Sequence, residues 1–306
     1  MLNTALSFVF LRVLMPRKES DLDEKKESGS ANATFKDVIS VMEQLLASFH
    51  EIGKDNYLVF EYAVVDGQLQ FYIAVPMELQ LIVEKQLTSF YPDAILEAID
   101  EYDIFGENSV QEACELVMKK EYNYPLKTYQ QLESDPINNI TNSLSKLGTG
   151  EGALIQIIVK PEPDKWQDAS KKLTQNILED KKKEKLSLKS IFKDVLKIFT
   201  ESPSEKKPDE QKRTTPLTEE MAKAVESKSH KVGFDTIIRI VTSSSDSFLA
   251  KAQLQGIVSA FVQFNHPRMN SLEKSKKVKS AQVIANSIFR LFSRSRSGKK
   301  MILSTE

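Results

Sequence analysis

The sequence predicts an α+β protein in which helices cover one face of an antiparallel sheet. Two observations lead to this fold class. A strand hairpin with helical periodicity on both sides opens the folded part, and a unit of strand, short turn and helix then recurs twice further along the chain. With 306 residues, 41% of them hydrophobic, the chain can bury a sizeable core in one or two domains.

Residues 1–18 begin with an apolar run that is too short for the roughly 20 residues of a membrane-spanning helix. A signal peptide, an interfacial helix and the last half of a membrane helix all fit, as does a short helix packed on the domain. Basic residues within and after the run disfavour export and favour a cytoplasmic location. We predict a membrane-proximal segment, and expect these residues to contact the membrane: Leu6, Phe8, Val9, Phe10, Leu11 and Leu14.

A polar linker is predicted over residues 19–33, because Leu22 is its only large apolar residue and little of it can be buried. Thr34 then suits a helix cap, and apolar residues recur at helical spacing from Phe35 to Phe49. An amphipathic helix therefore opens the first lobe, which we place at residues 34–170.

A hairpin follows, because two apolar runs flank Asp66 and Gly67, a pair suited to a two-residue turn. Pro76 ends the second run, and the spacing over residues 77–91 predicts another helix. Two further strands are expected around residues 94–100 and 110–122.

The unit of strand, turn and helix recurs at residues 153–165 and again from residue 234 to about Phe264. A ferredoxin-like arrangement is the common small fold with this order of elements. We therefore expect two ferredoxin-like lobes, with the second at residues 216–306.

A charged insertion separates the lobes at residues 171–215, which hold 13 basic and 8 acidic residues. Its first part has a helical apolar stripe, and its end is polar. A helix that binds a membrane or partner and a helix that packs on its own domain both fit.

Charge is sorted along the chain although the formal net charge is only −1. Residues 51–160 hold 18 acidic and 7 basic residues, whereas residues 266–300 hold 1 acidic and 10 basic residues. The basic tract could bind nucleic acid, anionic lipid or the acidic part of the same chain. The candidate contact residues are Lys274, Lys276, Lys277, Lys279, Arg290, Arg294, Arg296, Lys299 and Lys300.

No residue pattern predicts catalysis, a cofactor or a metal. The single cysteine, Cys114, lies in an apolar stretch and is expected to be buried. The three histidines are far apart, and the glycine-rich stretch 148–152 precedes a strand, where a phosphate loop would follow one. The densest acidic cluster, around Asp100 and Asp103, could bind a cation or basic partner, though such clusters are usually only solvated. An enzyme would need these carboxylates to meet a base in a pocket.

A family resemblance extends over most of residues 35–306 and is carried by one run in particular. The run YPLKTYQQLESDPINNI (residues 124–140), continuing to residues 150–161, resembles the N-terminal region of uncharacterised conjugation-type proteins of candidate-phylum bacteria, which are similar to FtsK-like coupling ATPases of type IV secretion. The resemblance implies an apolar membrane segment, then α/β lobes, then a motor domain with a phosphate-binding loop. Residues 300–306 look like the lead-in to that motor, and no catalytic residue carries over.

These observations favour a non-catalytic, membrane-proximal assembly region of a DNA-translocation or type IV secretion-like apparatus. We expect it at the cytoplasmic face of the inner membrane, as an oligomer that contacts other secretion subunits or a motor ATPase, and DNA. The alternative is a membrane-associated protein–protein adaptor without a nucleic-acid role.

Overall fold

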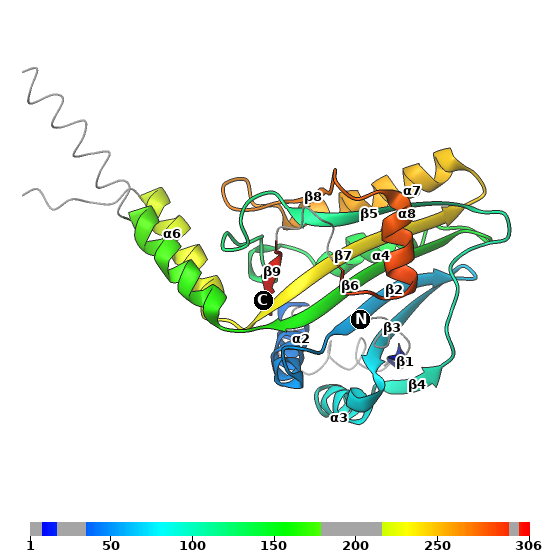
Figure 1. The fold of residues 1–306 in the computed structure, drawn as a ribbon, viewed down its shortest axis with the longest axis horizontal. Helices are drawn as coiled ribbons and strands as arrows, with labels where there is room; N and C mark the ends of the chain where they lie inside the picture. Colours follow the sequence, from blue (N-terminus) through cyan, green and yellow to red (C-terminus); the bar gives the residue numbers. More distant parts are fainter. Residues whose placement is uncertain (1–7, 17–34, 179–215, 294–299) are drawn as a thin grey trace, which may run out of the picture. The chain divides into compact units, whose positions relative to one another are not determined.

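The computed structural model describes residues 8–16, 35–178, 216–293 and 300–306 (Figure 1). They form two compact units. The sheet unit comprises the described residues up to Pro163 and from Val232 onward, and the hairpin unit comprises those from Asp164 to Lys231.

The described residues of the sheet unit form one nine-stranded sheet in the order β4-β1-β3-β2-β6-β7-β5-β8, with β9 paired to β7. Every pairing is antiparallel. The strands are β1 (Phe8–Leu14), β2 (Leu58–Val65), β3 (Gln68–Pro76), β4 (Ile95–Ile99), β5 (Val110–Met118), β6 (Gly152–Glu162), β7 (Gly233–Ser244), β8 (Leu272–Lys274) and β9 (Ile302–Ser304).

The helices of the sheet unit lie between these strands in the chain. They are α2 (Phe35–Ser48), η2 (Phe49–Ile52), η3 (Met77–Leu79), α3 (Gln80–Phe90), η4 (Tyr129–Gln131), α4 (Pro136–Leu144), α7 (Ser247–Ala260), η5 (Phe261–Phe264) and α8 (Ser280–Ile288).

The two halves of the sheet repeat one order of elements. The first half runs β1-α2-β2-β3-α3-β4, and its strands lie side by side as β4-β1-β3-β2. In the second half, β5-α4-β6-β7-α7-β8, the corresponding strands lie as β8-β5-β7-β6. Pairing of β2 with β6 joins the halves, so the order of the first half is mirrored in the second.

Four helices cover one face of the sheet. Leu45 of α2 and Val83 of α3 pack with Leu58 of β2, whereas Leu144 of α4 and Ile257 of α7 pack with Val64 of the same strand. Leu58 and Val64 are an even number of residues apart and therefore lie on one face of β2. Two hydrophobic clusters thus lie on this face, one under α2 and α3 and one under α4 and α7, and Ile157 packs against both.

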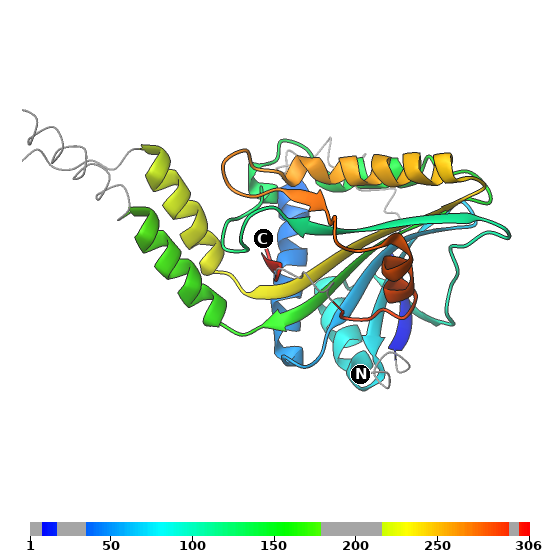
Figure 2. The same ribbon diagram turned by 45° about the horizontal axis from the view of Figure 1, so that its top comes forward.

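The opposite face is covered by α8 with residues 289–293, which together we call the C-terminal strap. Figure 2 shows α8 against the sheet on the side away from α7. Val283 of α8 packs with Ala63, Leu154 and Val241. The residues next to these three in their strands point to the opposite face of the sheet, the one covered by α2, α3, α4 and α7.

The hairpin unit is inserted between β6 and β7. Its described part is a helix over residues 165–178 and α6 (Pro216–Ser229), which lie side by side (Figures 1 and 2). Trp166 and Val225 are among its buried apolar side chains. The predicted insertion, residues 171–215, falls in this unit, and its part from 179 onward lies outside the described residues.

The expectation of a membrane-contacting segment was wrong for Phe8, Val9, Phe10, Leu11 and Leu14, because all five lie in β1. This strand is paired with β3 on one side and β4 on the other, and Leu11 is only 1% exposed. Six of the seven residues of β1 are apolar, with Arg12 the exception, which is why the run resembled a membrane segment. Leu6 lies outside the described residues, as does the predicted linker 19–33. Within the described part, no helix combines the length and apolar character needed to cross a membrane.

The boundaries predicted for the lobes differ from the strand pairing. β5 and β6 were assigned to the first lobe, yet both pair with β7 from the second. The predicted lead-in to a motor domain contains β9, which pairs with β7, and Ile302 is fully buried. The predicted hairpin is confirmed, with positive φ at both Asp66 and Gly67.

Candidate functional site

A row of polar side chains crosses the sheet on the face under the C-terminal strap. The strand registers place Glu61 opposite Gln156, Gln156 opposite Arg239, and Arg239 opposite Glu115. On the other side of Glu61 the row continues through β3, β1 and β4. The complete polar row is Glu97, Arg12, Tyr72, Glu61, Gln156, Arg239 and Glu115.

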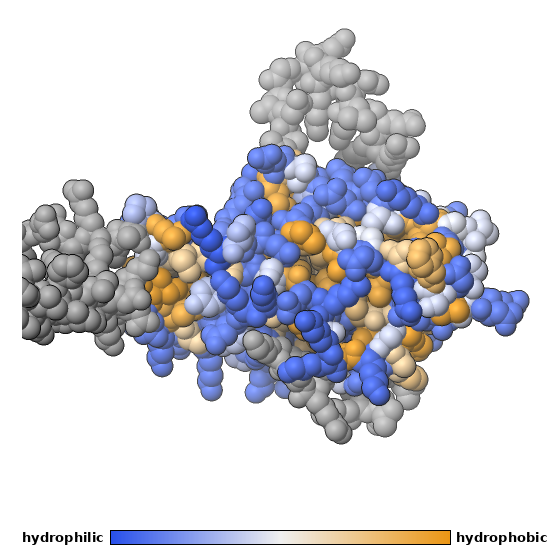
Figure 3. Space-filling view, turned by 90° about the horizontal axis from the view of Figure 1, so that it is seen from above, coloured by the Kyte–Doolittle hydropathy of each residue, from blue (hydrophilic) through white to orange (hydrophobic). Residues whose placement is uncertain are grey.

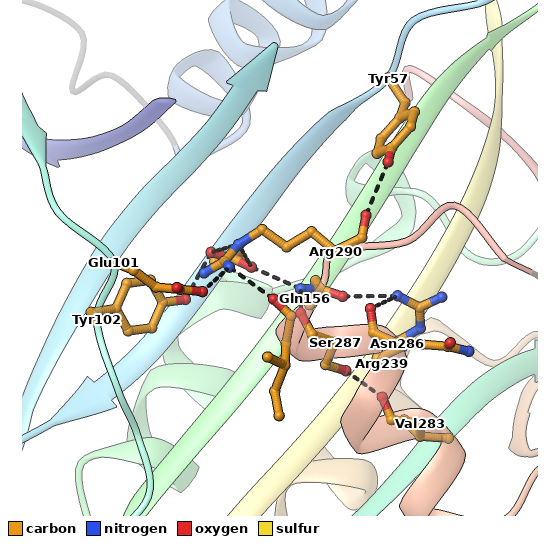
Figure 4. A network of polar contacts seen from close by, with 11 residues as sticks. Tyr57, Glu101, Tyr102, Gln156, Arg239, Val283, Asn286, Ser287 and Arg290 are labelled. Atoms are coloured by element: carbon orange, nitrogen blue, oxygen red, sulfur yellow. Dashed lines mark hydrogen bonds and ion pairs between the residues drawn. The ribbon is translucent and has the colours of Figure 1, made fainter. Parts of the chain in front are cut away.

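The centre of the polar row is fully buried. Glu61, Gln156 and Arg239 are each 0% exposed. Gln156 Nε2 donates to Glu61 Oε1 at 2.8 Å, and Arg239 Nη1 donates to Gln156 Oε1 at 3.0 Å (Figure 4). Gln156 therefore links a carboxylate on one side to a guanidinium on the other, using both ends of its amide.

Main-chain carbonyls of the strap accept further hydrogen bonds from Arg239 and Gln156. The buried Nε of Arg239 has no hydrogen-bond acceptor among the described residues. Arg239 Nη1 donates to Asn286 O at 3.0 Å, and Arg239 Nη2 donates to Leu291 O at 2.7 Å and Ser293 O at 3.1 Å. Gln156 Nε2 also donates to Ser287 O at 3.0 Å. The last carbonyls of a helix have no partner within the helix and carry partial negative charge, so a buried guanidinium is a suitable donor to them.

Arg290 connects the strap to the other end of this cluster. Its Nε lies 3.1 Å from Glu61 Oε1 and 3.3 Å from Oε2, and its Nη1 donates to Glu101 Oε1 at 3.1 Å. Its guanidinium also stands 4.2 Å from the centroid of the Phe10 ring. Burial would lower the pKa of Arg290, but the charges of Glu61 and Glu101 outweigh that effect, and the pKa is raised.

The backbone of Arg290 is left-handed, with φ of 49°. Its N–H donates to Ser287 O at 3.1 Å, and the N–H of Leu291 donates to Asn286 O at 3.0 Å. This pair of bonds is the helix ending for which glycine is usually chosen. An arginine at this position combines a strained backbone with a side chain that reaches Glu61.

Tyr102 completes the environment of Glu61. Its hydroxyl donates to Glu61 Oε2 at 2.7 Å, and its ring stacks on that of Tyr72 with centroids 4.1 Å apart. Burial, with the charge of Glu61, raises the pKa of Tyr102 well above its ordinary value. The hydroxyl therefore keeps its proton and remains a donor to the carboxylate.

Glu115 lies at the other end of the buried centre. Its Oε2 is 3.9 Å from Arg239 Nε, an ion-pair distance longer than a hydrogen bond. Burial lowers the pKa of Arg239 to about 10, against the opposing effect of Glu115. Arg239 therefore stays charged at neutral pH. At the far end of the row, Arg12 forms an ion pair with Glu97.

These groups face one another and the strap. The charges of Glu61, Arg239 and Arg290 are buried together with their hydrogen-bond partners, which is the condition under which buried charge is tolerated. The network therefore holds the C-terminal strap against the sheet through hydrogen bonds and ion pairs.

The predicted basic contact residues fall in separate places. Lys276, Lys277 and Lys279 are exposed in the turn between β8 and α8, and Lys274 is half-buried on β8. Arg290 is 5% exposed and is not a surface contact for nucleic acid or lipid. It pairs with Glu61 and Glu101, as the alternative of binding to the acidic part of the same chain predicted. Lys300 forms an ion pair with Glu162. Arg294, Arg296 and Lys299 lie outside the described residues.

The other candidates from the sequence, Cys114 and the acidic cluster, lie among contacts within the fold. Cys114 is buried as predicted, and burial raises the pKa of its thiol to about 11. In the acidic cluster, Glu101 pairs with Arg290, and Asp103 accepts from the N–H of Phe105 at 2.8 Å. Among the described side chains, no group of three or more His, Cys, Asp or Glu is placed to hold a metal ion.

Glu61, Gln156 and Arg239 were not predicted from the sequence. A signal was present, since each is a polar residue in the middle of an apolar strand. Two polar side chains at such positions in neighbouring strands indicate a buried pair, but only the register shows that they meet.

The surface seen from above is largely hydrophilic, with apolar side chains between the polar ones (Figure 3). Two large apolar side chains are strongly exposed on α7 and η5. Phe248 is 84% exposed and Val262 58%. Single exposed apolar residues are common at protein surfaces.

The fold and the network define an α+β protein whose own C-terminal segment is fastened over one face of its sheet. The chain belongs to the family described as a domain of unknown function, DUF8128, whose model matches residues 25–306. A comparison with curated proteins found no match.

Proposed function

We propose that this protein is a non-catalytic assembly region of a DNA-translocation or type IV secretion-like apparatus, and that the turn between β8 and α8 contacts DNA. The observation that carries the proposal is the exposure of Lys276, Lys277 and Lys279 together in that turn. Lysines grouped in this way neutralise several phosphates at once, with little dependence on base sequence.

The polar network supports the non-catalytic part of the proposal. A catalytic side chain must reach a substrate, whereas Glu61, Gln156 and Arg239 are buried and bonded to one another and to the strap. These groups stabilise the architecture that presents the lysines.

A finer description of the fold also belongs to the proposal. We regard each half of the sheet as a ferredoxin-like lobe. The support is the order of strand, helix, two strands, helix and strand in each half, with the first strand placed next to the third and fourth. The hairpin unit is then an insertion between the second and third strands of the second lobe.

The link to a motor ATPase, to secretion subunits and to the cytoplasmic face of the inner membrane is supported by the sequence resemblance alone. Because β1 is paired within the sheet, residues 8–14 do not support a membrane location.

DNA binding is tested by fluorescence anisotropy with a labelled duplex across a salt series. The variant K276E/K277E/K279E should lose most of the affinity and lower the slope of log K against log salt by about three, one for each lysine. The matched control K54E/K85E/K146E makes the same charge change at exposed lysines elsewhere and should retain most of the binding. Equal loss in both variants, or no binding by the wild type at low salt, would refute the DNA contact.

A protein–protein adaptor without a nucleic-acid role is the second candidate. The exposure of Phe248 and Val262 favours it, because large apolar side chains at a surface are typical anchors of protein interfaces. F248A and V262A would then weaken capture of a protein partner, while K276E/K277E/K279E would leave that capture intact.

A further inference from the structure

The two outer strands of the sheet have no strand partner on one side among the described residues. β4 is paired only with β1, and β8 only with β5. The outer edge of such a strand presents main-chain N–H and C=O groups that can pair with another chain. β4 contains five residues and β8 three, so each edge offers a short segment for pairing. On β8 the N–H of Leu272 is already used, because it donates to Asn265 Oδ1 at 2.8 Å.

The two edges carry opposite charge. Residues 91–109, which contain β4, hold six acidic and no basic residues. Asp93 and Asp100 are exposed there, just before and just after the strand. Residues 265–282, which contain β8, hold five basic residues and one acidic residue. We call β4 with Asp93 and Asp100 the acidic edge, and β8 with Lys274, Lys276 and Lys277 the basic edge.

From these edges we infer that copies of this chain associate head to tail, with the basic edge of one copy docked on the acidic edge of the next. Like edges repel each other, so β4 against β4 and β8 against β8 are both disfavoured. Opposite edges attract. Lys274 at the end of β8, with Lys276 and Lys277 just after the strand, therefore disfavours a basic strand and favours an acidic one.

Strand direction agrees with this arrangement. The path from β4 to β8 alternates in direction at every step, because each pairing is antiparallel. It contains eight strands, so β8 runs opposite to β4. When two copies have the same orientation, β8 of one and β4 of the next are therefore antiparallel, and the sheet continues with all covering helices on the same side.

A contact of this kind is heterologous and leaves one edge open at each end of the assembly. It closes into a ring if the rotation between copies permits, and otherwise gives an open filament. The inference rests on the assembly part of the proposed function and specifies the partner as a second copy. It does not depend on DNA.

Charge exchange between the edges tests the contact by sedimentation velocity of the full chain. K276E/K277E lowers the net charge of residues 265–282 from +4 to 0, and D93K/D100K changes that of residues 91–109 from −6 to −2. Each variant alone should associate at least about tenfold more weakly than the wild type, because the attraction between its two edges is reduced. An equal mixture of the two should recover association, since the unchanged basic edge of D93K/D100K meets the unchanged acidic edge of K276E/K277E.

Two double variants with equal charge changes serve as controls. K54E/K146E and E51K/E133K alter exposed positions outside both edges and should associate like the wild type. Wild-type association should also weaken as salt rises from about 0.05 M to about 0.5 M. A wild type that stays monomeric at low salt, or a mixture that does not recover association, would overturn the inference.

Variants of the acidic edge distinguish head-to-tail association from DNA binding. Variants of the lysines do not, because the lysines contribute to both. D93K/D100K should bind DNA at least as well as the wild type while losing self-association. Loss of DNA binding by K276E/K277E/K279E with normal recovery in the mixture would support both proposals. Recovery in the mixture without any DNA binding would support the head-to-tail contact and refute the DNA contact.

Discussion

Arg290 and Glu61 lie 229 residues apart in the sequence, and the guanidinium of one meets the carboxylate of the other at 3.1 Å beneath the C-terminal strap. Glu61 is 0% exposed and also accepts hydrogen bonds from Tyr102 and Gln156. The pair therefore joins the first half of the sheet to the segment that crosses the second half.

Arg290→Ala should strongly destabilise the sheet unit, because it leaves the carboxylate of Glu61 buried without its charged partner. The expected loss in the free energy of unfolding is about 3 to 5 kcal/mol. Urea unfolding followed by circular dichroism measures it. Glu61→Gln combined with Arg290→Ala should lose clearly less than the sum of the single changes, and strict additivity would show that the two side chains do not interact.

Arg290→Gly, compared with Arg290→Ala, tests the effect of the backbone conformation at this residue separately from the effect of its charge. Glycine and alanine both remove the guanidinium, but only glycine adopts the left-handed conformation without strain. The glycine variant should therefore be more stable than the alanine variant by about 1 kcal/mol. If alanine proved equal or better in the same urea experiment, the ending of α8 would have to differ from the one described.

Gly152→Ala should destabilise the protein, because an added Cβ would lie 1.9 Å from the main-chain oxygen of Ile104. The backbone at Gly152 and at Ile104 must move to make room. The expected loss in the free energy of unfolding is therefore about 3 kcal/mol, at the upper end of the range for an overpacked site. Gly256→Ala is the matched control. Its Cβ meets nothing within 4 Å, and it lies within α7, where alanine should stabilise by about 0.5 to 1 kcal/mol. Thermal unfolding should show shifts of opposite sign.

Lys228 in the hairpin unit gives a prediction that depends on pH. The residue is 5% exposed, and burial lowers its pKa from an ordinary value of 10.5 to about 7. Between these two values the unfolded chain binds more protons than the folded one, so stability rises with pH across this interval. Lys228→Met should therefore stabilise the unit at pH 7 by on the order of 2 kcal/mol or more, with less effect near pH 10.

The fluorescence of Trp166, the only tryptophan and a residue of the same unit, reports the unfolding of that unit. Lys228→Arg would keep the charge and should show no gain at pH 7. If Lys228→Met were less stable than the wild type at pH 7, the result would show that the wild-type fold stabilises the charged form of the Lys228 ammonium group.

Much of the secondary structure could be predicted because local patterns determine it. Asp66 and Gly67 specify their turn, and apolar spacing specifies α2 and α3. β1 could not be recognised in the same way. Six of its seven residues are apolar, so no alternation of polar and apolar side chains distinguishes the strand from a membrane segment.

The polar row depends on strand register, which the sequence does not display. Gln156 and Arg239 are neighbours only because β6 and β7 pair, although the hairpin unit separates these strands in the sequence. Arg290 was assigned to a basic surface because its neighbours in sequence are basic, whereas its position is decided by Glu61 on a distant strand. Local charge predicted the exposure of lysines 276, 277 and 279.

The position of the strap late in the chain has a consequence for synthesis. All eight strands of the path from β4 to β8 precede α8 in the sequence, so they leave the ribosome before the segment that covers the polar row. Until then, Glu61, Gln156 and Arg239 face water, where their charges and amide are solvated. Until the strap is made, the nascent sheet therefore presents a polar row on this face, between the apolar side chains that the strap later covers.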